Sequence, residues 1–365
     1  MQLARTLSAY IARQFFLWVA GAFGTMAGIS FLLDYIELIR RGGSRPQATW
    51  GVLLEMAALK LPHTAQEVLP FAILFGTMLA FWRLTRSNEL VVARAAGISV
   101  WGFLTPAMLV ALMIGVASVT VFNPVAAAML SSYQAFDSRI LNHGSDPLSL
   151  SNAGLWLRQS GEDGGQIIIR GNKVNAPQLE LRDVSLFFIG AKSQFTARVE
   201  ARTATLEPRS WLIEDGRRFR IDQPPQQFAA LRLPTRFTTN NLEESLAAPD
   251  TMSFWQLPGF ISLLEQSGFS ARRHRLYFNI LLARPFLFCA MVLVAATFSL
   301  RLQRRGGVGL MVVSGVAAGF LLYFLSDIVF ALGLSAKIPV LLAAWTPAGV
   351  SMIFGASMLL HLEDG

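Results

Sequence analysis

Six long apolar stretches run along the chain, three before a polar middle and three after it. They cover roughly residues 15–39, 62–82, 98–122, 276–300, 307–334 and 338–360. A helix needs about 20 mostly apolar residues to cross the hydrocarbon core of a bilayer, and each stretch is long enough. The pattern predicts a polytopic α-helical membrane protein with six transmembrane helices in a 3+3 arrangement.

The polar middle, residues 123–275, has the pattern of a β domain. Short runs of alternating or β-branched residues recur in it, and turn-forming sequences such as "SGEDGG" and "EDGR" separate them. The runs are "GLWLR" (154–158), "QIIIR" (166–170), "VSLFFI" (184–189), "QFTARVEARTATL" (194–206), "SWLIED" (210–215) and "RFRID" (218–222). This alternation predicts an inserted all-β domain, a sandwich or jelly roll. We therefore expect domains at 1–122, 123–275 and 276–365.

Composition agrees with a membrane protein. The chain is 53% hydrophobic and only 15% charged, which is too apolar for an ordinary soluble domain. Arginine accounts for 27 of the 31 Lys and Arg residues, and its planar fork suits phosphates and carboxylates. A GC-rich genome would favour arginine codons as well. The single cysteine, Cys289, lies in an apolar stretch and excludes an intrachain disulfide.

The orientation in the membrane follows from Lys and Arg in the short loops, because loops rich in these residues stay in the cytoplasm. One side carries Arg5, Arg13, Arg83, Arg86, Arg94, Arg301, Arg304 and Arg305. We therefore expect both termini to be cytoplasmic and the β domain to lie outside. In a bacterium this predicts a multi-pass protein of the inner membrane with a periplasmic β domain.

Cations also occur on the predicted outer side, where they work against this rule. They are Arg40, Arg41, Arg45 and Lys60 after the first stretch, and Arg272, Arg273 and Arg275 before the fourth. An anionic amphiphile would be a natural ligand, because phosphate binding requires several positive donors. Non-specific contact with lipid headgroups explains any one of them equally well. As a set they favour a lipid ligand.

Acidic residues lie in or near the apolar stretches. They are Asp34, Glu37, Glu67 and Asp327. Ionisable groups at such depths usually face a cavity or a partner, and an interfacial position reached by water is the alternative. Asp34 and Glu37 are three residues apart and therefore share one helix face.

Two pairs of small residues occur in the first and fifth stretches, Gly24 with Gly28 and Gly315 with Gly319. This spacing lets helix backbones approach closely in lipid. Packing within the chain and packing on the helix of a partner are equally compatible with it.

A charged segment, "RSNELVVARAAGISV", separates the second and third stretches at residues 86–100. Ser87 is a plausible N-cap and Gly97 a plausible end, so we expect a short helix within 86–97. Leu90, Val91 and Ala95 would form an apolar face, with Glu89 and Arg94 beside it. The helix either docks in the groove of a partner or lies on the membrane surface.

Local motifs for a catalyst or an ATP site do not occur in the sequence. There is no GxxxxGK[ST] phosphate loop, no HExxH and no GxSxG. The four histidines, His63, His143, His274 and His361, show no metal-ligand spacing. We therefore assign no catalytic residue and no metal ligand, and only a dispersed active site would support an enzyme.

Several segments are similar to one family of membrane proteins. "SNELVVARAAGIS" is close to that family's coupling helix, and "LSAYIARQFF", "FAILFG" and "IPVLLAAWTP" also fit. Together with the order of three spans, β domain and three spans, the chain resembles the LptF/LptG permeases of the lipopolysaccharide export ABC transporter over essentially its whole length. The N-terminus and "FLLDYIELIRR" look more like the LptG branch.

The resemblance implies a transporter subunit rather than an enzyme. It would pair with an LptF-like second permease, two copies of an LptB-like ATPase, an LptC-like bitopic protein and a periplasmic bridge. The assembly would extract lipopolysaccharide from the inner membrane and pass it toward the outer membrane. ATP and Mg would be held by the ATPase, with no cofactor bound directly by this chain and no nucleic acid involved.

The resemblance also implies roles for individual residues. Segment 86–97, with Glu89, Leu90, Arg94 and Gly97, would be the ATPase-coupling helix, and Glu89 would pair with a basic residue of the ATPase. The first span of one permease and the fifth span of the other would form the lateral gates, and the two glycine pairs lie on those spans. Asp34, Glu37 and Asp327 are candidates for the gate or an adjoining cavity.

Substrate contacts are implied in the same way. Arg40 and Arg41 match a basic pair of the family, whereas Asp34 and His63 stand where family lysines occur. The contacts to lipid A phosphates are then either redistributed or made to different phosphates. A membrane-embedded enzyme modifying envelope lipids, with Asp34, Glu37 or Asp327 as acid or base, is the alternative, and a signalling subunit that moves no lipid is a third.

Overall fold

The structure, a computed structural model, describes residues 2–42, 48–141, 148–151, 154–160, 165–175, 180–190, 194–220, 223–235, 248–266, 269–301 and 308–364. Within these residues six helices are long and apolar enough to cross a membrane. They are Thr6–Gly42, Trp50–Arg86, Val100–Phe136, Arg272–Ser299, Val313–Leu334 and Val340–His361. The predicted 3+3 arrangement of six transmembrane helices is confirmed.

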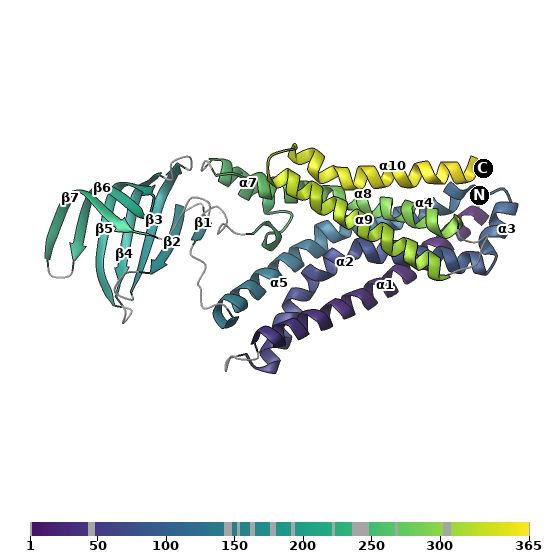
Figure 1. The fold of residues 1–365 in the computed structure, drawn as a ribbon, viewed down its shortest axis with the longest axis horizontal. Coiled ribbons are helices and arrows are strands. Elements are labelled where there is room, and N and C mark those ends of the chain that lie inside the picture. Colours follow the sequence, from purple (N-terminus) through teal and green to yellow (C-terminus); the bar gives the residue numbers. More distant parts are fainter. Residues whose placement is uncertain are drawn as a thin grey trace. The chain divides into compact units, whose positions relative to one another are not determined.

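The helices before the β domain are α1 (Gln2–Gly42), α2 (Trp50–Arg86), α3 (Glu89–Ala95), α4 (Val100–Ala117), the π-helix η1 (Ser118–Phe122), α5 (Asn123–Phe136) and the π-helix η2 (Asp137–Leu141). Those after the sheet are the 3₁₀-helix η4 (Pro249–Thr251), α7 (Leu257–Gln266), α8 (Arg272–Arg301), α9 (Val308–Leu334) and α10 (Val340–Asp364). The start of α1, the end of α10 and the short α3 lie at one end of the helical part (Figure 1).

The second and third spans are longer than the apolar count predicted. The helix α2 begins at Trp50 rather than near residue 62, and the third span continues to Phe136 rather than ending near 122. At 1.5 Å per residue these 37-residue helices are about 55 Å long, against about 30 Å of hydrocarbon. Polar side chains in the first turns of α2, such as Glu55 and Lys60, lower its hydropathy without interrupting the helix.

A proline explains the π-helix in the third span. Pro124 has no N–H, so the carbonyl of Thr120 loses the donor that an α-helix would supply four residues later. The indole Nε1 of Trp255 donates to that carbonyl at 3.1 Å. A distant residue therefore satisfies a backbone group that would otherwise be unpaired in the membrane.

The chain divides into two compact units. The helical unit comprises residues 1–136, Asp250–Trp255 and Arg272–Gly365, and the β unit comprises Asp137–Pro249 and Gln256–Ala271. These bounds differ from the predicted 122/123 and 275/276 divisions because the third span runs on and Asp250–Trp255 returns to the helices. There the side chain of Asn123 accepts from the N–H of Phe254 at 2.8 Å.

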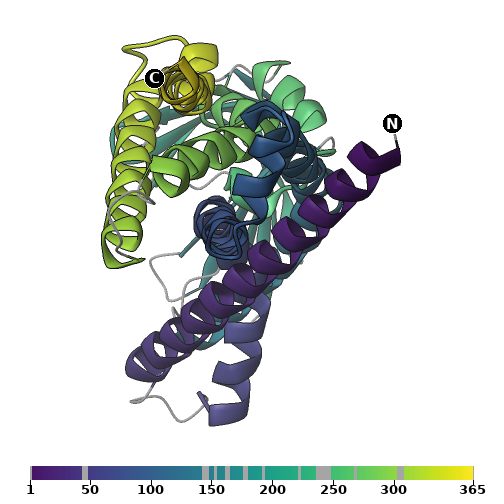
Figure 2. The ribbon, with the colours of Figure 1, turned by 90° about the vertical axis from the view of Figure 1, so that its right-hand side faces the viewer.

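Within the helical unit α1 lies on one flank and α9 and α10 on the other, with α2 and α8 between them (Figure 2). The helix α8 is the most buried span. Its Phe288, Val292 and Ala296 are almost fully buried and share one hydrophobic cluster with residues of α1, α2 and α4. The flanking helices keep large apolar side chains exposed, among them Leu33 on α1 and Phe320 on α9.

The β unit contains one antiparallel sheet of seven strands in the order β1 to β7. The strands are β1 (Leu148–Ser151), β2 (Gly154–Ser160), β3 (Gln166–Asn175), β4 (Glu180–Ile189), β5 (Phe195–Glu207), β6 (Ser210–Arg220) and β7 (Gln223–Pro234). The inserted all-β domain is confirmed. Because each strand pairs with the next through a short connection, the described sheet is a meander, whereas a jelly roll in the strict sense uses Greek-key connections.

The predicted turn at "EDGR" is wrong, and β1 and β7 were not predicted. β6 continues through this segment because Asp215 adopts a φ of 51° and Gly216 is buried opposite Phe228. Glu214 and Asp215 are both exposed, so the buried face shifts by one residue within the strand. The same shift occurs at Arg182 and Asp183 of β4, where Asp183 also has a positive φ. The turn-forming residues here mark the point where the buried face of the strand shifts by one residue, rather than a reversal of the chain.

Candidate functional site

The short helix α3 lies between the second and third spans, as predicted, but it begins differently. Asn88, rather than Ser87, is its N-cap, with a left-handed φ of 58°. Ser87 instead caps the end of α2, where its N–H donates to the carbonyl of Arg83 at 3.0 Å. Its hydroxyl also donates to Oε1 of Glu89 at 2.8 Å. The predicted N-cap therefore belongs to the preceding helix, because the left-handed Asn88 breaks the backbone between the two.

Gly97 ends α3 as predicted. It has a φ of 81°, which a residue with a side chain rarely adopts. Its N–H donates to the carbonyl of Arg94 at 2.9 Å, and the N–H of Ile98 donates to that of Ala93 at 3.1 Å. This pair of bonds is a Schellman ending and satisfies the last carbonyls of the helix.

The side chains of α3 divide into an anchor and an exposed face. Leu90 is only 5% exposed and packs in the core of the helical unit, so it is not available to a partner. Glu89 and Arg94 are exposed, and Val92 is 67% exposed. The exposed side chains of α3 therefore include Glu89, Val92, Arg94 and Ala95, whereas the side chain of Val91 lies outside the described residues. Val92 was missed because helical spacing alone did not say which apolar residue faces inward.

A partly buried ion pair joins α1 to α2. The Nζ of Lys60 lies 2.6 Å from Oδ1 of Asp34, and the hydroxyl of Thr64 donates to Oδ2 at 3.1 Å. The side chains of Lys60 and Asp34 are only 31% and 14% exposed. Asp34 therefore faces the neighbouring helix of its own chain, and its pairing with Lys60 and Thr64 was not predicted from the sequence.

Two further pairs lie along the same helices. Arg40 donates twice to the carboxylate of Glu37 at 2.8 Å, in an exposed bidentate pair. Nε2 of His63 lies 3.4 Å from Oε1 of Glu67. Arg41 is exposed, and Arg45 lies outside the described residues. The structure thus brings Asp34, Glu37, Arg40 and His63 onto two adjacent helices.

The arginines at the start of α8 have different surroundings. Arg272 donates to the carbonyl of Gly333 at 2.8 Å and to that of Ile338 at 3.4 Å. It therefore holds the connection between α9 and α10. Arg273 and Arg275 are exposed. Of the six predicted lipid-binding arginines, Arg272 has the clearest structural role.

The two glycine pairs differ in their packing. A Cβ added to Gly315 would lie 2.5 Å from the sulfur of Met78, and one on Gly319 would lie 3.2 Å from Phe71. Around Gly24 and Gly28 nothing lies within 4 Å of an added Cβ. The fifth-span pair therefore packs on α2 of its own chain, and the first-span pair is open. Asp327, also on α9, is exposed.

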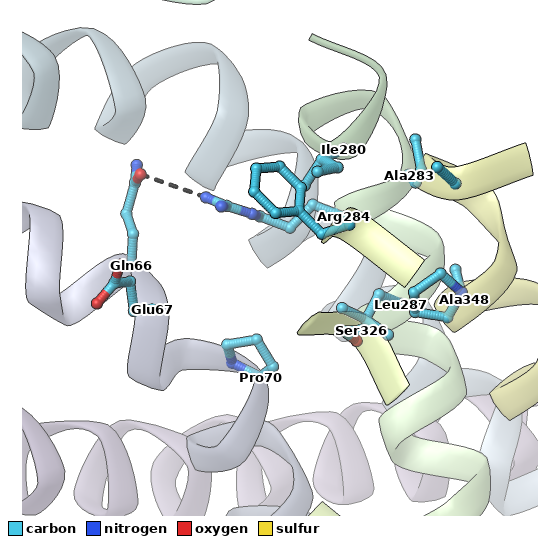
Figure 3. Close-up of a pocket in the computed structure, with 13 residues that line it drawn as sticks. Gln66, Glu67, Pro70, Ile280, Ala283, Arg284, Leu287, Ser326 and Ala348 are labelled. Carbon is cyan, nitrogen blue, oxygen red and sulfur yellow. Dashed lines mark hydrogen bonds between the residues drawn. The ribbon is translucent and has the colours of Figure 1, made fainter. Parts of the chain in front are cut away.

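A polar site inside the helical unit was not predicted. Nη1 of Arg284 on α8 donates to Oε1 of Gln66 on α2 at 3.2 Å (Figure 3). Nε2 of Gln66 donates to the carbonyl of Ser118, the first residue of η1, also at 3.2 Å. Gln66 is only 2% exposed. The amide is therefore fixed between the π-helix and the guanidinium.

A cavity of about 150 Å³ lies beside this arginine. Its wall comes from α2, α8, α9 and α10 and is mostly apolar, with Ile280, Leu287 and Pro347 among its residues. Arg284, Gln66 and Glu67 supply its charged and polar groups. The signal in the sequence was a single cation inside "ILLARPFLF", and it was missed because only acids were sought within the spans.

Among the described residues no three His, Cys, Asp or Glu side chains lie close enough together to hold a metal ion. The acidic residues predicted in or near the apolar stretches instead form pairs, apart from Asp327, which is exposed, and Arg284 contacts the neutral amide of Gln66.

Comparison with known proteins gives a consistent assignment. The family model described as "Lipopolysaccharide export system permease LptF/LptG" matches residues 9–361. The Lipopolysaccharide export system permease protein LptG of Escherichia coli K12 is 23% identical over 378 residues, covering 99% of each chain. The protein of the same name from Haemophilus influenzae is 23% identical over 356 residues, covering 94% of this chain and 95% of the relative.

The match therefore includes the α3 segment, the paired charges of α1 and α2, and the inserted β domain. With six candidate spans around that domain, the chain belongs to the LptF/LptG family of lipopolysaccharide export system permeases.

Proposed function

We propose that this chain is the LptG-like half of a permease that extracts lipopolysaccharide from the bacterial inner membrane and passes it to a periplasmic bridge. The observation that carries the proposal is α3, a short helix anchored by Leu90 that leaves Glu89, Val92 and Arg94 exposed. A permease without a nucleotide site of its own needs such a surface to receive movement from an ATPase. An enzyme that modifies envelope lipids is not favoured, because the family consists of transport proteins.

The proposed orientation places α3 and both termini in the cytoplasm and the β domain in the periplasm. The excess of Arg near α3 supports it under the rule for short loops. The common end occupied by α3, the start of α1 and the end of α10 agrees with an even number of spans (Figure 1).

The proposed partners are two copies of an LptB-like ATPase, which bind ATP and Mg, an LptF-like second permease, and an LptC-like bitopic protein. The exposed apolar faces of α1 and α9 support a second permease, since such surfaces usually mark interaction sites or lipid contacts. The open glycine pair of α1 would allow a partner helix to approach closely there.

For the substrate, we propose that exposed cations at the outer ends of the helices meet lipid A phosphates. Arg41, Arg273 and Arg275 are the exposed candidates, and Arg40 is held in place by Glu37. Lys60 and Asp34 neutralise one another within the helical unit. The contacts are thus redistributed away from position 34 toward these arginines.

The test is a charge change on α3. We expect Glu89→Lys to lower co-purification of the ATPase and lipopolysaccharide-stimulated ATP turnover at least tenfold, because it places a cation against the basic residue with which Glu89 would pair. Glu89→Ala should give a smaller loss. Glu214→Lys, a change of the same charge at an exposed acid of β6, is the matched control.

Normal turnover and export with Glu89→Lys would rule out docking through α3. Pull-down from native membranes then identifies what the chain does assemble with. Recovery of a second permease without an ATPase would leave the fold and family intact but refute the proposed energy source.

A further inference from the structure

Arg284 is a cation within a membrane span that has only a neutral hydrogen-bond partner among the described residues. Nη1 donates to the amide oxygen of Gln66, and no ion pair to Arg284 occurs in the part of the chain that the structure describes. A guanidinium has five N–H donors in a planar fork. One bond to an amide leaves most of these donors unused among the described residues, and Arg284 lines the cavity.

The nearest acid on the cavity wall is directed elsewhere. Glu67 contacts His63 at 3.4 Å, and its side chain is 62% exposed. Glu67 moderates the positive charge of the cavity from a distance but does not occupy the fork of Arg284. The opposite charge expected at Arg284 is therefore missing at hydrogen-bonding range.

The depth of the guanidinium suits a lipid headgroup that lies slightly inside the boundary of the apolar layer. Its partner Gln66 lies four residues after the start of the apolar stretch 62–82, which is about 6 Å along α2. Because Nη1 of Arg284 lies 3.2 Å from the amide oxygen of Gln66, the guanidinium lies at about the same depth.

The cavity can hold such a group. Its volume of about 150 Å³ is several times the roughly 30 Å³ share of one water. The remaining wall, with Ile280, Leu287 and Pro347, suits hydrocarbon rather than a free ion. A guanidinium held in place beside apolar side chains is suited to bind an anionic oxygen group that is attached to an apolar chain.

We infer that Arg284, held by Gln66, is a binding site for the phosphate of a membrane amphiphile, taken up between α2, α8, α9 and α10. Two sources share this chemistry, a lipopolysaccharide phosphate and the phosphate of a bilayer phospholipid. The inference rests on the proposed function only in naming lipopolysaccharide as one of them. Gln66 acts as a positioning residue, since its amide nitrogen is fixed on Ser118.

The competing explanation is structural, with Glu67 as the distant counter-charge of Arg284. The two explanations give opposite signs for one variant. If the site binds phosphate, Glu67→Gln removes a repelling charge and raises binding. If Glu67 only balances Arg284, the same variant leaves binding unchanged and lowers the melting temperature.

The experiment uses photocrosslinking from the cavity wall. The full chain, purified with its native partners in dodecyl maltoside, carries p-benzoylphenylalanine at Ile280, one turn before Arg284 on α8 (Figure 3). The probes are lipopolysaccharide, the same lipopolysaccharide after enzymatic removal of its phosphates, and phosphatidylglycerol. This detergent contains no phosphate. The same photoprobe at Phe320, an exposed position of α9 away from the cavity, is the positional control.

We expect Arg284→Gln to lower the crosslinking of phosphorylated probes about tenfold at Ile280 and to leave Phe320 unchanged, as for loss of a charge-assisted bond. Arg284→Lys should retain an intermediate yield because it keeps the charge without the fork. Glu67→Gln should raise the yield twofold or more. Melting temperatures of all variants separate loss of binding from loss of folding, and the Glu67→Gln gain does not depend on a destabilised protein.

Equal yields with Arg284→Gln, or with the dephosphorylated probe, would overturn the inference. An unchanged or lower yield with Glu67→Gln would also overturn it, and an unchanged yield with a lower melting temperature would favour the structural explanation. Crosslinking of phosphatidylglycerol but not lipopolysaccharide would identify a bilayer phospholipid as the ligand. This last result, together with normal turnover in Glu89→Lys, would refute the proposed function and leave the Arg284 site standing.

Discussion

Gly24 with Gly28 on α1 and Gly315 with Gly319 on α9 share one spacing but have opposite surroundings. The α9 pair meets Met78 and Phe71 of α2, and the α1 pair meets nothing within 4 Å of an added Cβ. The close approach between α1 and α2 is made instead by Gly76 of α2, where an added Cβ would lie 2.5 Å from Cα of Val19. The spacing of small residues therefore allows contact but does not identify which helix makes it.

The two glycine pairs show that the flanking helices α9 and α1 pack on α2 in different ways. The helix α9 is packed through its own glycines against flexible side chains, whereas α1 is held by the glycine of its neighbour and by the pair between Asp34 and Lys60. Glycines of α1 thus remain available for a contact outside the chain. Substitutions on each side of this comparison should have graded effects on stability.

The largest effect is expected for Gly76→Ala. The new methyl would meet the backbone of Val19, which cannot move aside as a side chain does, so we expect a loss of about 2 kcal/mol. The measurement is the melting temperature of the purified protein in detergent. Gly51→Ala, on the same helix with nothing within 4 Å, is the control and should melt unchanged or slightly higher. Equal melting of the two variants would show that α1 and α2 are not tightly packed at Gly76.

An intermediate effect is expected for Asp34→Lys. The variant places two cations together at a partly buried position. The expected loss of stability therefore lies between the small contribution of an exposed ion pair and the large cost of an unpaired buried charge. We expect a loss of about 1–2 kcal/mol, with most of it recovered in Asp34→Lys combined with Lys60→Asp. A double-mutant cycle on melting measures the recovery. Simple additivity of the two changes would mean that the pair does not hold α1.

The smallest effect compares the two glycine pairs directly. In Gly315→Ala the methyl meets the mobile end of Met78, so the loss should not exceed about 1 kcal/mol. Gly24→Ala should gain up to about 1 kcal/mol, because alanine favours the helix and finds open space. The two melting temperatures should therefore move in opposite directions. A matching loss in Gly24→Ala would mean that its face is packed within the chain after all.

The fold was largely predictable because its main signals are local. Apolar runs predicted all six spans, and alternation predicted most strands of the sheet. The errors occurred where local composition and structure diverge. Asp215 and Gly216 are common in turns, yet cross-strand pairing with Phe228 keeps them in β6. Glu55 and Lys60 lower the hydropathy of helical turns that extend beyond the apolar stretch.

The candidate site was predictable only in part. Segment 86–97 was found from its charges and from Gly97, although Ser87 was wrong as its N-cap. The direction in which Leu90 points was not predicted, since core and partner surfaces attract the same residue types. The contact between Gln66 and Arg284 joins positions 218 residues apart, and no periodicity reveals it. The family assignment came from resemblance along the whole chain rather than from the chemistry of any single residue.

The anchoring of α3 has a mechanical consequence. Its N-terminal end is fastened to α2 through Ser87, its C-terminal end closes on Gly97, and Leu90 is embedded in a cluster that also contains Phe288 of α8. A force applied to Glu89 or Arg94 therefore cannot be absorbed by bending of the seven-residue helix. If α3 receives a force from a partner, these contacts would transmit it to the buried residues of α2, α4 and α8.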